Sequence, residues 1–169
     1  MELELFANQM ASQAGIIHSL TLGITDEQTR WKPDPHSWSI LEVINHLYDE
    51  ECADFRLRLD IILHHPDQPW PPINPQGWVT ERLYNKRDLA QSVDNFLQER
   101  RKSLAWLRGL AAPDWQAHVV SPFGQLSAGD IFAAWVAHDL LHLRQLVELH
   151  WAYTQQAARP YQVNYAGEW

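Results

Sequence analysis

Two histidines stand four residues apart in a segment that otherwise has the composition of a buried helix, 137-AHDLLHLRQL-146. Side chains at positions i and i+4 are neighbours on a helix surface, so the rings of His138 and His142 can reach one point. A buried imidazole without hydrogen-bond partners costs about 1–3 kcal/mol. A divalent metal ion would satisfy both rings, since neutral imidazole is its commonest protein ligand. The spacing alone leaves another interpretation open, in which both are hydrogen-bonded core histidines or a capping pair.

A third histidine, His46, falls on a helical stripe that is apolar except for His46 and Glu50. Three histidines without a thiolate leave coordination positions open, which is the form of a catalytic metal site rather than a structural one. Glu50 follows His46 by one helical turn and is a candidate general base, or a carboxylate that orients the imidazole. The alternative for Glu50 is a partly exposed boundary residue. Gln145 lies on the histidine face, either to orient a water molecule or to bond to the backbone.

Four long segments with helical periodicity must position these side chains. We expect helices over residues 2–22, 39–65, 88–110 and 127–156. The stretch 66-PDQPWPPINPQGW-78 contains five prolines and predicts a long loop between the second and third helices. Long ordered loops are often functional. The sequence therefore predicts one all-α domain over residues 1–169, a four-helix bundle with a long connection in its middle.

Local signals mark the ends of these helices. Two capping boxes, in which a serine and an acidic residue three positions later satisfy free amide groups, are predicted at Ser39–Glu42 and Ser127–Asp130. Residues 118–127 are interpreted as a turn region, and no strand of useful length is expected. The tail 161-YQVNYAGEW-169 is aromatic, and we expect it to pack on the bundle.

Composition excludes several classes of function. The net charge of −8 and the pI near 5.5 argue against a nucleic-acid surface, which needs clustered basic residues. The basic run 100-RRK-102 is interpreted as a solvated helix face. Cys52 is the single cysteine, so no intrachain disulfide is expected. No signal peptide or membrane-spanning run is visible, and the cytoplasm is the expected compartment.

Other polar residues receive structural interpretations. Glu51 lies on an apolar stripe and is expected to pair with an arginine such as Arg30 or Arg144. Asp139 lies beside the histidine face and is expected to bond across to another helix. Six further histidines are interpreted as surface or turn residues: His18, His36, His64, His65, His118 and His150.

The chain resembles the DinB-like (YfiT-like) superfamily of metal-binding four-helix bundles. The likeness rests on 38-WSILEVINHL-47, on 138-HDLLHLRQL-146 and on the connector 25-TDEQTRWKPDPHSWS-39. In element order it covers nearly the whole chain. In that family the corresponding histidines bind a divalent metal, so the resemblance assigns the role of metal ligand to His46, His138 and His142.

The resemblance also implies a function. It is that of a metal-dependent enzyme, either a thiol S-transferase that uses a low-molecular-weight thiol or a hydrolase, and relatives often form homodimers. Zinc and nickel are the first candidates for the metal, followed by iron and manganese. The alternative is a non-catalytic metal-binding or stress-associated bundle. An open site with a carboxylate near the metal would favour catalysis, whereas a sealed site would favour the alternative.

Overall fold

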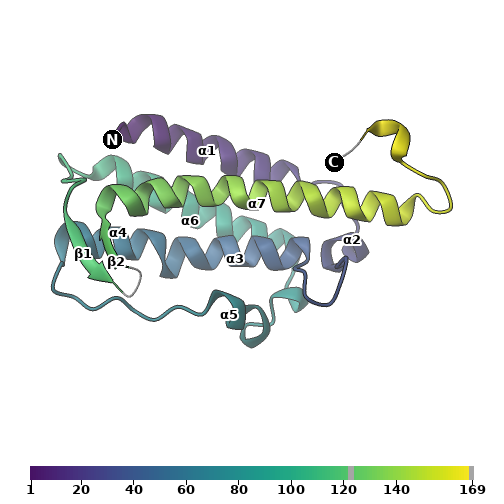
Figure 1. Ribbon diagram of the computed structural model, residues 1–169, viewed down its shortest axis with the longest axis horizontal. Coiled ribbons are helices and arrows are strands. Elements are labelled where there is room, and N and C mark those ends of the chain that lie inside the picture. Colours follow the sequence, from purple (N-terminus) through teal and green to yellow (C-terminus); the bar gives the residue numbers. More distant parts are fainter. Residues whose placement is uncertain (122–123, 168–169) are drawn as a thin grey trace.

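The computed structural model describes residues 1–121 and 124–167 and shows a bundle of long helices (Figure 1). In chain order the elements are α1 (Leu3–Ser19), α2 (Asp26–Arg30), α3 (Ile40–Ala53), α4 (Phe55–His64), α5 (Pro75–Glu81), the 3₁₀ turn η1 (Tyr84–Lys86), α6 (Leu89–Gly109), β1 (His118–Ser121), β2 (Gly124–Ser127), α7 (Ala128–Ala157) and the 3₁₀ turn η2 (Asn164–Ala166). Helix α6 packs against α1 and α3, while α7 packs against α1 and α4. The predicted all-α four-helix bundle is therefore confirmed.

The second predicted helix is divided in two. Asp54 has the non-helical backbone angles φ −125° and ψ −92° and separates α3 from α4. Aspartate is a weak helix former because its carboxylate competes for nearby hydrogen-bonding groups. Here that carboxylate contacts the buried Arg58 one turn later. The single helix expected over residues 39–65 was wrong at this one point.

The predicted helix caps are present. The amide nitrogen of Glu42 lies 3.2 Å from Ser39 Oγ, and the Ser39 amide lies 2.9 Å from Glu42 Oε2. Ser127 and Asp130 form the same reciprocal pair before α7. These caps fix where α3 and α7 begin, and so they set the position of every side chain that the two helices present to the core.

Two connectors contain more structure than expected. The predicted loop 66–78 is irregular only as far as Asn74, whose side chain caps α5, 3.0 Å from the amide of Gly77. Pro75 occupies the first turn of α5, where a missing N–H costs nothing. The predicted turn region 118–127 contains an antiparallel hairpin, in which His118 pairs with Ser127. Residues 122 and 123 lie outside the described part of the chain.

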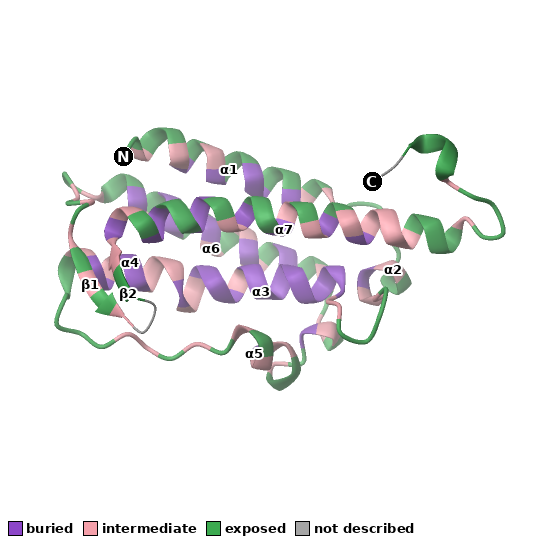
Figure 2. Ribbon diagram, in the orientation of Figure 1, coloured by how far each residue is buried: buried purple, intermediate pink, exposed green. Residues whose placement is uncertain are grey.

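The core has a polar layer between two apolar clusters. One cluster surrounds Trp135 and Phe132, and the other surrounds Ile44 and Leu146. Along α7 the polar residues His138, Asp139 and His142 fall between these clusters, and Figure 2 shows that α3 is buried along almost its whole length. The layer contains the candidate histidines, so the bundle holds them inside its core rather than on its surface.

The same layer holds a cluster of buried charges. Arg100 is 2% exposed and binds Glu51 and Asp139 from two other helices. The expectation that Asp139 bonds across to another helix is confirmed. The expectation that residues 100–102 form a solvated face was wrong for Arg100, which is also the arginine that pairs with Glu51.

The chain end beyond α7 does not pack as expected. Tyr161 is 80% exposed, and Tyr165 is fully exposed. Within residues 161–167 the tail therefore contributes little to the core, and the packing expected there was wrong; residues 168 and 169 lie outside the described part. None of the described helices has the length and apolar character needed to cross a membrane.

Candidate metal centre

Three histidines from two helices meet at one point of the polar layer. Helix α3 supplies His46, and α7 supplies His138 and His142. The Nε2 atom of His138 lies 3.3 Å from Nε2 of His46 and 3.1 Å from Nε2 of His142. The sequence predicted the pairing of His138 and His142 from their spacing, and the packing of α3 against α7 adds His46. Among the described residues, these three form a group of side chains that could hold a metal ion.

Burial keeps all three rings neutral. His46 is 4% and His142 is 6% exposed, and His138 is partly buried. Burial, followed by the charges of the other two histidines, lowers the pKa of His46 to about 2. Burial and the neighbouring His142 lower the pKa of His138 to about 3, and burial also lowers the pKa of His142. Neutral imidazole is the form that binds a metal.

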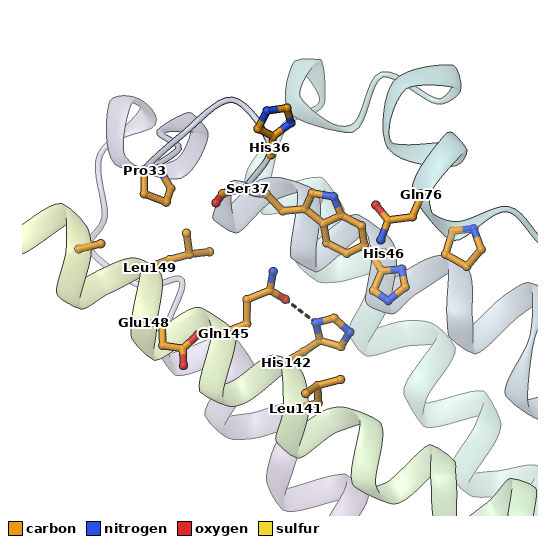
Figure 3. A pocket seen from close by; sticks show the side chains of 13 residues that line it. Pro33, His36, Ser37, His46, Gln76, Leu141, His142, Gln145, Glu148 and Leu149 are labelled. Atoms are coloured by element: carbon orange, nitrogen blue, oxygen red, sulfur yellow. Dashed lines mark hydrogen bonds between the residues drawn. The ribbon is translucent and has the colours of Figure 1, made fainter. Parts of the chain in front are cut away.

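Gln145 determines which nitrogen of His142 is free. The Oε1 atom of Gln145 lies 2.7 Å from Nδ1 of His142 (Figure 3). Because a carbonyl oxygen can only accept, Nδ1 carries the proton and Nε2 presents its lone pair to the cluster. Gln145 was expected to orient water or to bond to the backbone, and instead it orients the imidazole.

Glu50 lies behind His46. Its Oε1 atom is 3.6 Å from Nδ1 of His46, on the side of the ring away from the other histidines. Burial, together with a hydrogen bond to Asp54, raises the pKa of Glu50 to about 8. Neither Nδ1 of His46 nor Oε1 of Glu50 has another partner among the described residues. The position is that of a carboxyl group that orients an imidazole, the second of the two roles predicted for it.

The arrangement of the three Nε2 atoms fits a metal ion better than it fits a hydrogen-bonded cluster. The Nε2 atom of His138 carries at most one hydrogen, so it cannot donate fully to Nε2 of both His46 and His142. At least one pair of these nitrogens therefore meets with its lone pairs facing each other. Two nitrogens about 2.1 Å from one ion are about 3.0–3.4 Å apart at octahedral or tetrahedral angles. The observed separations of 3.1 and 3.3 Å fall in that range.

A cavity of about 600 Å³ reaches the histidines from the surface. Figure 3 shows His46 and His142 on its floor, with Gln145 on α7 and Gln76 on α5 beside them. Trp38 lines the cavity, and its ring centroid is 4.9 Å from that of His46. The site is thus accessible to a small molecule and is not sealed within the bundle.

Several residues that line this cavity were not predicted from the sequence. Residues Pro75 and Gln76 come from α5, which was expected to be loop, and His36 lines the cavity although it was interpreted as a turn residue. Only Pro75 could have indicated this helix from the sequence, because proline is common at the first position of a helix. The adjacent pair His64 and His65 is exposed and lies beside Asp60, away from the cluster.

Comparisons with known proteins agree with this architecture. The family profile of the DinB superfamily matches residues 12–146. Among solved structures, YfiT from Bacillus subtilis superimposes with a TM-score of 0.77 at 16% sequence identity, over 88% of this chain and 85% of that protein. YfiT is described as a probable metal-dependent hydrolase with an unusual four-helix bundle topology. At this identity the likeness shows the fold alone. No curated protein matches the chain.

Proposed function

This chain belongs to the DinB superfamily, and on that premise we propose that it is a metal-dependent enzyme with His46, His138 and His142 as ligands. The observation that carries the proposal is the convergence of three neutral imidazoles, lone pairs inward, on the floor of an open cavity. A metal bound there supplies Lewis acidity, which makes water or a thiol a usable nucleophile near neutral pH.

The chain's own residues prepare the site. Gln145 holds His142 in the tautomer that offers Nε2, and Glu50 stands where it can hold His46 in the same way. The indole of Trp38 lies beside two of the imidazoles, nearly parallel to the ring of His142 at 6.4 Å between centroids and 4.9 Å from the ring of His46. Fixed ligand tautomers are what a reactive metal site needs.

Two reactions suit this arrangement. The description of YfiT supports hydrolysis, and the resemblance to thiol-dependent relatives supports transfer of a low-molecular-weight thiol to an electrophile. Both need a bound nucleophile and room for a substrate, and the cavity provides about 600 Å³. The open cavity meets one of the two conditions set for catalysis over a metal-binding bundle without turnover. The other condition, a carboxylate near the metal, is not met by Glu50, which lies on the far side of the His46 ring.

Activity assays on a panel of activated esters, amides and thiol–electrophile pairs test the proposal. We expect turnover that disappears with chelator, returns with zinc or nickel, and falls by orders of magnitude in His142→Ala. His64→Ala is the matched control, because His64 is exposed and lies outside the cluster. Turnover that survives chelation and His142→Ala would refute a metal-dependent reaction, and metal binding without turnover across the panel would favour the non-catalytic alternative.

A further inference from the structure

A second cavity of about 890 Å³ is lined by the irregular segment 66–73 and strand β1. Strand β1 belongs to the hairpin at one end of the bundle (Figure 1). We call this cavity the Arg58 groove, lined by Arg58, residues 66–73 and residues 118–121. Its walls are mostly apolar and include four prolines, Trp70 and Val119. The residues of the metal centre do not line it, so it is a separate feature of the molecule.

Arg58 is the single arginine or lysine in the lining of this groove. It is 7% exposed, and its guanidinium carbon lies 4.5 Å from the ring centroid of Trp70. The Nε edge of the guanidinium contacts Asp54. Among the described residues, the buried Nε1 of Trp70 has no hydrogen-bond partner, and the buried Nε of Arg58 contacts Asp54 without a well-formed hydrogen bond. The terminal nitrogens of Arg58 make no hydrogen bond to a described residue and, unlike Nε, are not fully buried.

Such unmet donors in an apolar wall point to a ligand. A buried donor without a partner costs about 1–3 kcal/mol, and more when it is charged. The two terminal nitrogens of arginine form a planar fork that matches a carboxylate. Asp54 already neutralises much of the charge of Arg58, and Asp67 lines the groove as well, so a second negative charge on the ligand would have no counter-charge.

We propose that the Arg58 groove binds a small organic monocarboxylate with an apolar body. The carboxylate accepts hydrogen bonds from the terminal nitrogens of Arg58, and the apolar body packs against Trp70 and the prolines. The volume of the groove lies within the usual range for small-molecule sites, which are mostly apolar with a few placed polar groups. The inference does not depend on the function of the metal centre.

Calorimetric titration of the full chain with 4-phenylbutyrate, and with its uncharged analogue 4-phenylbutanamide, tests the proposal. We expect saturable binding of the acid and binding of the amide that is weaker by about tenfold or more, because the charge-assisted fork is lost. Equal affinity for acid and amide, or no saturable binding of the acid, would overturn it.

Variants locate the bound acid. Arg58→Gln should abolish binding, but it also leaves Asp54 without its partner, so a second pair of variants avoids the core. Val120 is 86% exposed and lines the groove. Val120→Asp should weaken binding about two- to fivefold through charge repulsion, whereas Val120→Asn should not. Equal binding by both Val120 variants contradicts the proposal.

A final variant separates this groove from the metal centre, where a carboxylate is also a conceivable ligand. His142→Ala should bind 4-phenylbutyrate with unchanged affinity, since His142 lines the other cavity. Binding that is lost in His142→Ala and kept in Arg58→Gln would place the acid at the metal centre and overturn the inference.

Discussion

The polar layer of the bundle contains two clusters that share helices α3 and α7 but differ in their hydrogen bonding. In the arginine cluster, the guanidinium of Arg100 donates to Glu51, to Asp139 and to the carbonyl of Met10. Glu51 in turn accepts from Ser103 and Trp135. Its buried charges are thus paired and hydrogen-bonded.

The histidine cluster lies beside it, and His138 and Asp139 are consecutive residues of α7. There the three Nε2 atoms face one another, and a cavity opens onto two of the rings. A buried network in which the polar groups are partners of one another stabilises one folded structure. A buried cluster whose lone pairs face one another is instead arranged to bind a ligand. Burial of polar side chains therefore does not single out a candidate site in this fold, whereas an unmet hydrogen-bonding capacity does.

The sharpest contrast between the clusters is in stability. Arg100→Met should lower the free energy of unfolding by about 3–5 kcal/mol, because it leaves Glu51 and Asp139 buried without their cation. Arg101→Met is the matched control, since Arg101 is exposed and should change little. In metal-free protein, His142→Ala should cost less than Arg100→Met. Urea denaturation measures all three, and equal midpoints for the Arg100 and Arg101 variants would show that the arginine cluster is not structural.

Glu50 offers the next largest effect. Glu50→Ala should weaken metal binding about 10–100-fold, because Nδ1 of His46 loses the group that orients the ring. Glu50→Gln should bind the metal almost as tightly as the parent chain does, and its rate of turnover should match that of the parent chain. Glutamine resembles the protonated carboxyl, with an oxygen that can accept from Nδ1 and an NH₂ group that can donate to Asp54. Metal affinity and turnover are measured on both variants.

Two other outcomes for Glu50 are informative. If Glu50→Gln keeps the metal but loses about 10²–10⁴-fold in rate, Glu50 transfers protons, as in the general-base role considered from the sequence. If Glu50→Ala binds metal with unchanged affinity, the positioning role is wrong.

The sequence predicted the histidine cluster far better than the arginine cluster, for a physical reason. His138 and His142 are joined by the local geometry of one helix, which spacing reveals. Arg100 meets Glu51 and Asp139 across 49 and 39 residues, and an arginine next to Arg101 and Lys102 has the local pattern of a surface. Sequence periodicity and the capping motifs therefore predicted the bundle and the starts of two helices, but they did not predict which helix faces meet.

The irregular parts were predicted least well, because tertiary contacts decide their paths. The break at Asp54 accompanies the contact of that residue with Arg58, and Pro75 was predicted to lie within a loop rather than at the beginning of α5. The walls of both cavities come largely from such segments. The chemistry of the site could thus be inferred from the sequence, but the shape of its access route could not.

The homodimer expected from the sequence stays a prediction, and the outer face of α7 offers a way to test it. Leu140 and Val147 are 50% and 37% exposed on that face, outside both clusters. We expect a dimer mass by light scattering at micromolar concentration, and a monomer mass for the double variant Leu140→Glu/Val147→Glu. A monomeric parent chain would rule the dimer out, and a dimer that persists in the variant would place the interface elsewhere.

The smallest expected effect concerns Cys52, which lies next to Glu51 of the arginine cluster. Burial, followed by the charge of Glu99, raises the pKa of the Cys52 thiol to about 11. A raised pKa means that the thiolate is scarce at neutral pH and increases only as the pH approaches 11. Alkylation by iodoacetamide should therefore be slow at pH 8 and rise with pH. Cys52→Ser should leave turnover unchanged. A loss of activity in this variant would indicate that the Cys52 thiol, and not a group bound at the histidine site, is the nucleophile.

The most direct test of the account is the metal stoichiometry of tag-free protein. Calorimetric titration of the metal-free chain with zinc, and then with nickel, should show about one ion per chain, bound as well by His64→Ala as by the parent. His142→Ala should show no saturable binding while its helical circular dichroism persists. Full occupancy in His142→Ala, or no binding by the parent chain, would contradict the assignment of the three histidines as a metal centre.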